Sequence, residues 1–461
     1  MKIALVEPYV PEKLVSLRAY PDKSEPTHLL GMYNLLSRNG IEVEIIDAYS
    51  YQMSEQELIE KIVKGMFTHV GFTTYDYKTC LSYLSDVIKA LSGKVVVILG
   101  GPGPTYTPDR ILSFFRPDWM IRGEGEKALL DLVLHELNAN DLSRDTVVTR
   151  SDGTFVVYST PMSLDDIPFE RPYSLEFYDY VASPRLQKGC RGKCIFCCGA
   201  YQKNIEYRSP QNALRLIEYL VYQKKATIIT PDGPDFTASP DKANRIIGTV
   251  VEASIPLKKF SPEVCLHTLA SSIRKAPDVW RKLGSMTQLN FETSIDSFLY
   301  QRLKRLGKNV PKDFVDNIFD HIEKILESCE CTIMISRIAI DPFITIDEFL
   351  AENSLYIRLL ERFGDRVTIG GMLMNDFKPV WGTPSMAKGE YDNPWAQKDV
   401  LIDPIMAEFK KRFLDNHRFK EWCKLAEALP KYNERNLVFR EILRVTNEYA
   451  TKIHLKGCAH V

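Results

Sequence analysis

The sequence has no long apolar run, and no stretch approaches the roughly 18 consecutive apolar residues that a membrane-spanning helix needs. We therefore expect no membrane span. The N-terminal segment Met1–Glu7 has no long apolar stretch after its lysine and no cleavage site of small residues, so we also expect no secretory signal. Both absences favour a protein of the reducing cytoplasm.

An excess of charge of one sign is missing as well. The 461 residues carry 59 Lys and Arg against 60 Asp and Glu, a net charge of −1, and no long block of like charge interrupts them. Proteins that bind nucleic acid or an anionic membrane usually present a basic face. We therefore expect no nucleic-acid partner and predict a small-molecule or peptide substrate.

Cysteine, by contrast, is plentiful and unevenly spread. Four of the ten cysteines lie within nine residues, from Cys190 to Cys198. A disulfide framework explains such a group poorly in a large chain of a reducing compartment. The group indicates metal or redox chemistry.

The length exceeds that of a usual single domain, so we expect two to three domains. Residues 1–140 alternate short β-like runs with amphipathic helical patterns, which predicts a flavodoxin-like (Rossmann-type) parallel sheet. Such a sheet presents its ligand crevice at the carboxyl ends of its strands. The strands are expected at Lys2–Glu7, Glu42–Asp47, Thr68–Thr73, Lys94–Gly100 and Asp118–Arg122.

Residues 141–180 are predicted to form a linker with a hairpin that turns at Asp152 and Gly153. A second alternation over residues 181–388 predicts six β/α units, a partial barrel with its site at the strand ends. Residues 389–461 have a charged helical pattern, which predicts a small α-helical C-terminal domain. The first barrel strand is expected to end at Gly189, and the next five are expected at Thr227–Thr230, Glu263–Leu269, Gln288–Ser294, Thr332–Ile340 and Val367–Leu373.

Cys190, Cys194 and Cys197 form a Cys-x3-Cys-x2-Cys motif on a loop that contains glycine. Three thiolates can hold three irons of a cubane cluster and leave the fourth iron open, where the amino and carboxylate groups of S-adenosylmethionine (SAM) can chelate it. The alternative is a structural zinc site, which needs four ligands. Cys198 offers a fourth thiol, but adjacent cysteines point in different directions.

With Phe196 before its last cysteine, this motif resembles the defining motif of the radical SAM superfamily. The resemblance implies a partial (β/α)6 barrel and a [4Fe-4S] cluster on Cys190, Cys194 and Cys197. It also implies reductive cleavage of SAM to a 5′-deoxyadenosyl radical, with a reductant such as flavodoxin or ferredoxin.

Further positions of the barrel resemble SAM contacts of the superfamily. Glu292 and Ser294 are candidates for its ribose or amino group, and for Glu292 the alternative is a bond to a neighbouring barrel residue. Arg337 either faces the SAM carboxylate or pairs with a barrel acid. Asp235 ends a strand where the superfamily contacts the methionine part of SAM, or it caps the following turn. Glu292 and Arg337 are the candidate catalytic residues.

A flavodoxin-like domain ahead of the cysteine loop resembles the cobalamin-binding branch of the superfamily. Relatives that ligate cobalt with histidine carry Asp-x-His-x-x-Gly. Here Pro26 stands where the aspartate would be, and we expect His28 to be a helix-start residue rather than a ligand. The cofactor contacts that the resemblance implies in the strand-end loops are Tyr75, Gly101, Gly103 and Glu124, and for Tyr75 the alternative is a buried aromatic of the core.

What this branch mostly does implies cobalamin-dependent methyl transfer to an unactivated carbon of a small-molecule, lipid or peptide substrate, as in natural-product biosynthesis. A first alternative keeps the radical step but leaves the N-terminal domain without cobalamin, so that the substrate radical is dehydrated, cyclised or rearranged. A second alternative is a non-catalytic metal-binding protein with structural cysteines.

Overall fold

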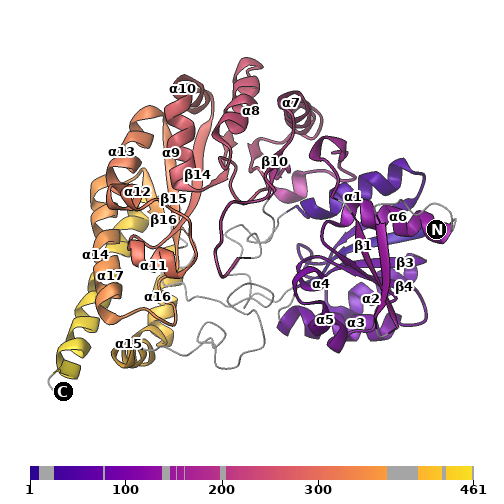
Figure 1. Cartoon of the computed structure of the whole chain (residues 1–461), viewed down its shortest axis with the longest axis horizontal. Helices are drawn as coiled ribbons and strands as arrows, with labels where there is room; N and C mark the ends of the chain where they lie inside the picture. Colours follow the sequence, from indigo (N-terminus) through magenta and orange to yellow (C-terminus); the bar gives the residue numbers. More distant parts are fainter. Residues whose placement is uncertain are drawn as a thin grey trace. The chain divides into compact units, whose positions relative to one another are not determined.

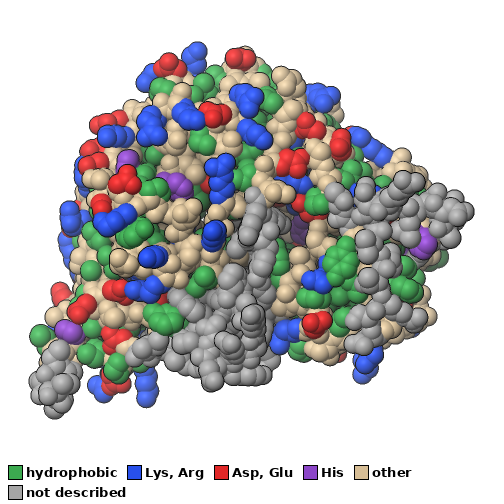
Figure 2. Space-filling model, in the orientation of Figure 1, with side chains coloured by type: hydrophobic (Ala, Val, Ile, Leu, Met, Phe, Trp, Pro, Cys, Tyr) green, Lys and Arg blue, Asp and Glu red, His purple; other side chains and the backbone are tan. Residues whose placement is uncertain are grey.

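The computed structural model divides into two compact units, Met1–Arg185 and Leu186–Val461 (Figure 1). None of the helices in the described ranges combines the length and apolar character that crossing a bilayer requires. Basic and acidic side chains are interspersed on the face that Figure 2 shows. The structure describes residues 1–9, 25–75, 78–137, 146–151, 153–159, 161–197, 204–370, 403–427 and 432–458.

The first unit is built on a seven-stranded sheet of order β2-β1-β3-β4-β5-β7-β6. Its strands are β1 Lys2–Glu7, β2 Glu42–Asp47, β3 His69–Thr73, β4 Val96–Gly100, β5 Trp119–Arg122, β6 Thr146–Ser151 and β7 Thr154–Ser159. All neighbours are parallel except β6, which runs antiparallel to β7. The five predicted strands are confirmed. The hairpin that we expected in a linker instead extends the sheet, because β7 pairs with β5.

Helices cover both faces of this sheet, because successive side chains of a strand point to opposite faces. Ala4 and Val6 of β1 belong to a hydrophobic cluster with residues of α2 (Glu55–Lys64) and α3 (Lys78–Leu91). Ile3 and Leu5 belong to a second cluster with residues of α1 (Thr27–Arg38) and α6 (Gly125–Leu137). The helices are α1 Thr27–Arg38, α2 Glu55–Lys64, α3 Lys78–Leu91, α4 Pro102–Tyr106, α5 Pro108–Phe114 and α6 Gly125–Leu137. The carboxyl edge is therefore where polar groups can meet a ligand.

The strand order also locates the crevice along that edge. Strand β1 pairs with β2 on one side and with β3 on the other. In open α/β sheets the order reverses at such a point, and ligands bind outside the carboxyl ends of the two strands beside it. Here those ends are Glu7 of β1 and Thr73 of β3.

In the second unit the strands run in the order β16-β15-β14-β12-β11, with β13 beside β14. Each neighbouring pair among these strands is parallel, as a partial barrel requires. A short antiparallel pair, β9 Gln187–Lys188 and β10 Glu206–Tyr207, precedes it. The sheet strands are β11 Ile228–Ile229, β12 Lys259–Phe260, β13 Glu263–Val264, β14 Gln288–Asp296, β15 Cys331–Arg337 and β16 Val367–Ile369.

The barrel helices are α7 Pro210–Glu218, α8 Pro240–Glu252, α9 Leu266–Lys275, α10 Pro277–Met286, α11 Tyr300–Arg305, α12 Lys312–Asp316, α13 Ile318–Ser328 and α14 Ile346–Phe363. The described part of the C-terminal region is helical, with α15 Pro404–Phe409, α16 His417–Glu427 and α17 Tyr432–Cys458. One strand prediction, Glu263–Leu269, is wrong beyond Val264, because α9 begins at Leu266 and buries residues at helical spacing. Residues 371–373 of the last predicted strand lie outside the described residues.

Candidate functional site

The three motif cysteines lie together on irregular backbone that follows β9. All three are thiols outside any disulfide, and all are half-buried. A Cβ on Gly192 would lie 3.3 Å from the Sγ of Cys190 and 3.5 Å from that of Cys194, so both sulfurs flank this glycine. The Cys197 N–H donates to the Cys194 carbonyl at 3.2 Å, which closes a turn around half-buried Phe196. The loop therefore brings the sulfurs of Cys190 and Cys194 close to one another.

Burial makes these thiols reluctant to ionise in the absence of a cation. It is the largest influence on both Cys190 and Cys194, raising the pKa of the first and taking that of the second to about 12. A charge on Cys197 raises both pKa values further. Within the ranges described, no group of three or more His, Cys, Asp or Glu side chains is already arranged to hold a metal ion. Thiols of this kind become ligands when a metal displaces their protons.

A buried lysine stands behind the cysteine loop. The Ile195 N–H donates to the Leu306 carbonyl at 3.1 Å, which fixes the turn after α11 against the loop. In that turn Lys308 contacts the carboxylate of Asp296 and the carbonyl of Ser294. Its ammonium lowers the pKa of Cys190 and of Cys194. Burial opposes the charge on Lys308, but Asp296 and the neighbouring thiols hold its pKa above the usual value.

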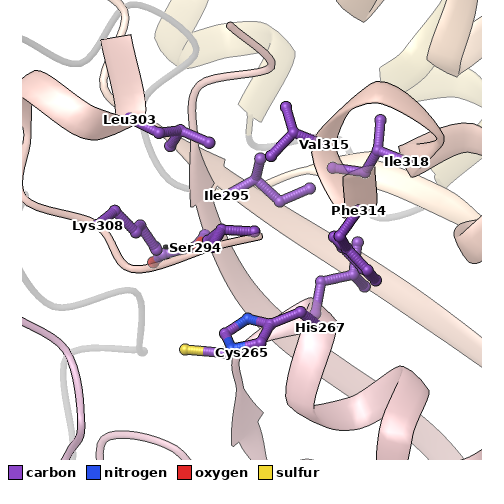
Figure 3. A pocket seen from close by; sticks show the side chains of 11 residues that line it. Cys265, His267, Ser294, Ile295, Leu303, Lys308, Phe314, Val315 and Ile318 are labelled. Carbon is purple, nitrogen blue, oxygen red and sulfur yellow. Dashed lines mark hydrogen bonds between the residues drawn. The ribbon is translucent and has the colours of Figure 1, made fainter. Parts of the chain in front are cut away.

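A pocket of about 20 Å³, enough for one water molecule, lies at the carboxyl end of β14. Figure 3 shows Lys308 beside Ser294, with His267 and Cys265 facing them. Burial lowers the pKa of His267 to about 4 and raises that of Cys265. At neutral pH the pocket thus contains a neutral imidazole, an un-ionised thiol and one cation.

Glu292 and Ser294 share one face of β14, since they are two residues apart. Glu292 is buried and accepts a hydrogen bond from the Ser261 hydroxyl at 3.0 Å, which is the contact with a barrel neighbour left open above. Ser294 is exposed. Glu263, which the sequence did not single out, lies opposite Glu292 on β13. Desolvation by the surrounding protein is the main cause that raises the pKa of Glu263, and the charges of Glu292 and Asp232 add to it. The side chain nevertheless keeps contact with solvent.

Asp235 is buried, and its oxygens are already used by the protein. Its Oδ1 accepts from the N–H groups of Thr237 and Cys265 and from the Thr268 hydroxyl, each at 3.1 Å. This geometry caps the turn after β11 and ties it to the start of α9. Burial raises the pKa of Asp235.

Arg337 is separated from Glu292 and Ser294. Its guanidinium donates to Asn353 at 2.9 Å and lies 4.5 Å from the centre of the Tyr356 ring, and both partners are on α14. Ser336 pairs with Ser294 and therefore lies on the same face of the sheet. Arg337 is the next residue of β15, so its side chain points to the opposite face. Among the residues described here, neither Nε nor Nη1 of Arg337 has a hydrogen-bond partner, and Arg337 forms no ion pair. Burial lowers its pKa.

In the first unit the predicted cofactor contacts gather at the carboxyl edge. The loop after β4 packs tightly on the end of β3: the Gly103 N–H donates to the Thr74 carbonyl at 2.8 Å. A Cβ on Gly101 would lie 3.2 Å from Thr74 N, and Gly101 has φ +96°. Glu124 is half-buried in the loop that precedes α6. Glycine is needed here for close packing of backbone on backbone.

A pair of polar side chains occupies the same edge. The His28 Nε2 is 2.9 Å from Glu7 Oε2 and 3.0 Å from Thr73 Oγ1, and the Tyr75 hydroxyl donates to Glu7 Oε1 at 3.2 Å. Sequence reasoning missed Glu7. The available signal was a carboxylate at the end of an otherwise apolar strand, which is costly to bury unless it is paired.

A wider hollow of about 670 Å³ adjoins the carboxyl end of β2. Its walls include the rings of Tyr51 and Phe177, which stack with centroids 4.3 Å apart. Asp47 accepts a hydrogen bond from Tyr178 at 3.0 Å, and burial raises the pKa of Asp47. No motif indicated this hollow, because residues 173–178 are far from β2 in sequence.

Three comparisons bear on these sites. The family model described as the B12 binding domain matches residues 30–133. Among curated proteins, the chain is 24% identical over 213 residues to the anaerobic magnesium-protoporphyrin IX monomethyl ester cyclase of Synechocystis sp., covering 43% of this chain and 42% of that protein. It is 26% identical over 236 residues to an uncharacterized methyltransferase of Pyrococcus horikoshii, covering 48% and 50%. The chain thus spans about half the length of the curated relatives it matches.

Among solved structures, the cobalamin-dependent SAM radical enzyme OxsB with aqua-cobalamin bound matches with a TM-score of 0.72 at 14% identity, covering 97% of this chain and 72% of that one. The radical SAM methyltransferase TsrM from Kitasatospora setae, with cobalamin and a [4Fe-4S] cluster bound, matches with a TM-score of 0.61 at 14% identity, covering 84% and 74%. At such identities these likenesses show the fold.

Proposed function

We propose that this chain is a radical SAM enzyme of the B12-binding branch and that it transfers a methyl group to an unactivated carbon. Its cysteine motif would hold a [4Fe-4S] cluster, and its N-terminal unit would bind cobalamin. The observation that carries the proposal is the presence of both parts in one chain: three thiols on a single loop, and a B12 binding domain over residues 30–133. When bound, the cluster supplies an electron that cleaves SAM to methionine and a 5′-deoxyadenosyl radical, and cobalamin supplies the methyl group.

The donor set fits an iron–sulfur cluster in kind and number. Three thiols suit three irons and leave one iron open for SAM. Cys190 and Cys194 flank Gly192, where the missing side chain leaves room between the sulfurs. Lys308 adds a buried positive charge that favours thiolates over thiols. Because burial keeps these thiols protonated, their side chains would turn toward the irons and release their protons as the cluster assembles.

SAM would lie on the face of β14 that Glu292 and Ser294 share. Ser261 orients the Glu292 carboxylate, which can then accept a hydrogen bond from a ribose hydroxyl or the amino group. Phe196 lies between two of the cluster cysteines and could pack on the adenine. We assign Asp235 and Arg337 to positioning: Asp235 holds the start of α9, and Arg337 holds β15 against α14.

Cobalamin would lie over the loops after β3, β4 and β5, which contain Tyr75, Gly101, Gly103 and Glu124. The hydrogen bond from the Gly103 N–H to the Thr74 carbonyl holds the β4 loop close to the end of β3, and a side chain at Gly103 would disturb this packing. The substrate would be a small molecule, lipid or peptide, and a flavodoxin or ferredoxin would supply electrons.

A cyclisation is the second candidate, because the Synechocystis relative is named a cyclase. In that reading the radical step at Cys190, Cys194 and Cys197 is kept, and the substrate radical closes a ring without receiving a methyl group.

The test is anaerobic reconstitution of the full chain with iron, sulfide and hydroxocobalamin, followed by desalting and incubation with SAM and a reductant. We expect retained corrin absorption and formation of both 5′-deoxyadenosine and S-adenosylhomocysteine. The triple variant Cys190→Ala, Cys194→Ala, Cys197→Ala should form neither, while Cys265→Ala, a thiol outside the motif, should keep its iron. Turnover of SAM without corrin binding would favour the cyclase reading, and failure to assemble a SAM-responsive cluster would eliminate both readings.

A further inference from the structure

The cysteine loop carries two cations at the surface of the second unit. Arg191 directly follows Cys190 and Lys193 directly precedes Cys194, and both basic side chains are exposed. Neither of them forms an ion pair with an acidic residue of the described ranges. Because neighbouring Cα atoms are only about 3.8 Å apart, each charge lies beside a motif cysteine.

A third exposed cation lies on the segment that packs against this loop. The Ile195 N–H donates to the Leu306 carbonyl at 3.1 Å, and a Cβ on Gly307 would overlap the carbonyl of Lys193. The turn after α11 therefore touches the loop directly. Lys304 belongs to the last turn of α11, and its carbonyl accepts from the Gly307 N–H at 3.1 Å. Its side chain is exposed and has no acidic partner within the part of the chain that the structure describes.

Other cations near α11 are balanced by acids. Arg305 pairs with Glu348 at 2.7 Å, and Lys312 pairs with Asp316, so these pairs add no net charge to the surface. The cations that remain without such a partner are the three exposed ones, which we call the basic rim: Arg191, Lys193 and Lys304.

Exposed cations without acidic partners beside a redox cofactor suit an acidic protein that delivers electrons. Complementary charges speed the encounter of two proteins and orient them, even where few other contacts form. Redox partners typically meet through small, transient interfaces. A nucleic acid or an anionic membrane would call for a broader basic face, whereas this chain has a net charge of −1.

We propose that the basic rim is the docking surface for an acidic one-electron carrier protein, a proposal that rests on the cluster assigned above to the cysteine loop. The carrier loses one electron and the cluster gains it, and neither an atom nor a proton is transferred. Arg191 and Lys193 attract the carrier to the loop itself, and Lys304 extends the attraction over the adjoining turn.

The salt dependence of cluster reduction tests the proposal without any variant. We would reconstitute the full chain with iron and sulfide, mix it anaerobically with flavodoxin hydroquinone, and follow the visible absorption of the cluster by stopped flow. The rate constant should fall steeply as sodium chloride is added, because salt screens the attraction between opposite charges. A rate constant that does not change with salt, or that rises, would overturn the proposal.

Charge reversal identifies the surface. The double variant Lys193→Glu, Lys304→Glu should reduce the rate constant with flavodoxin about tenfold at low salt. Its rate with reduced methyl viologen, a small cation that needs no docking surface, should not decrease. Equal slowing with both reductants would contradict docking, because it would indicate a change in the cluster itself.

Lys282→Glu is the matched control. Lys282 is an exposed lysine of α10, which precedes the amino end of β14, whereas the turn that carries Lys308 contacts the carboxyl end of that strand. This variant should keep the wild-type rates with both reductants. Flavodoxin rates as low as those of the double variant would overturn the proposal, because they would show that any lost surface charge has the same effect.

A binding measurement needs no cluster. Oxidised ¹⁵N-labelled flavodoxin should show chemical-shift changes on its acidic face when the full chain without cofactors is added, and the double variant should remove them. Unchanged shifts with the wild-type chain would count against the basic rim. A chain that binds flavodoxin but assembles no cluster would instead refute the proposed function, so the two failures are distinguishable.

Discussion

Lys308 is a nearly buried cation beside the cysteine loop that we propose holds the cluster. Its side chain is 9% exposed, and it already lowers the pKa of Cys190 and Cys194. A cation stabilises the more negative, reduced form of a cluster. We expect Lys308→Met to lower the cluster's midpoint potential by roughly tens of millivolts, the scale of one charge at an effective dielectric constant of about 20. A redox titration followed by electron paramagnetic resonance measures it.

Two controls separate charge from packing at this position. Lys308→Arg keeps the positive charge and should keep most of the potential. Lys304→Met removes an exposed charge from α11 and should change little. Equal shifts in Lys308→Met and Lys308→Arg would contradict the electrostatic explanation.

His267 gives a pH dependence of stability. Its pKa is near 6.5 in the unfolded chain and is lowered to about 4 in the folded protein by burial, with Lys308 adding to the effect. Between these values the unfolded state binds more protons, so stability is full above pH 6.5 and falls as the pH drops toward 4. We expect a loss of up to about 2–3 kcal/mol from this group.

Urea unfolding at pH 7 and at pH 5 checks this prediction. His267→Gln should show a smaller difference between the two pH values than the wild type does. An equal difference in both proteins would show that other groups cause the acid sensitivity.

The contacts of individual residues also show which features could be predicted from the sequence and which could not. The cysteine motif is local, so its position on one loop could be predicted. The pairing of Glu7 with His28 joins β1 to α1, and the face that Arg337 occupies depends on α14. Neither follows from a motif, because burial and partners at long separation are set by tertiary packing.

At the scale of elements, α11 is anchored by a buried charge network that the sequence did not reveal. Arg302 is fully buried, binds Asp341 at 2.6 Å and also contacts the carboxylate of Glu352. Removing the cation leaves two buried carboxylates uncompensated. We expect Arg302→Met to reduce the free energy of unfolding by about 3–5 kcal/mol.

The same helix offers a control for this prediction. Arg305 pairs with Glu348 at 2.7 Å, but both side chains are partly exposed. Arg305→Met should therefore cost less than about 1 kcal/mol. Chemical denaturation of both variants measures the difference, and similar losses would contradict the importance of burial.

Element types were predicted best where strand and helix patterns are long. In the first unit, five strands of alternating βα units could be predicted, because strands such as β1 and β4 are nearly continuous apolar runs and each strand is followed by an amphipathic helical pattern. In the barrel, β12 and β13 have two residues each, too few for a period of two to appear. The pattern after Val264 was therefore assigned to a strand, whereas Leu266, Leu269 and Ile273 are buried along one face of α9.

At the scale of the whole molecule, the chain divides into two compact units. Because each unit is compact by itself, we expect the two cofactors to be lost independently. The triple cysteine variant should lose its iron and keep its corrin. Gly103→Val should do the reverse, since a Cβ there would lie 2.9 Å from Ile111 Cδ1 and 3.0 Å from the Thr74 carbonyl, which displaces the β4 loop.

Iron analysis and corrin absorbance of the desalted proteins measure both losses in one preparation. Gly100→Ala is the matched control three residues away, because a Cβ at Gly100 meets no atom within 4 Å. This variant should retain both cofactors. If Gly103→Val lost its iron together with its corrin, the cluster would depend on the first unit, and the independence inferred from the two compact units would be refuted. Loss of corrin alone would instead locate cobalamin binding at the carboxyl edge of the first sheet, where Gly103 packs against Thr74.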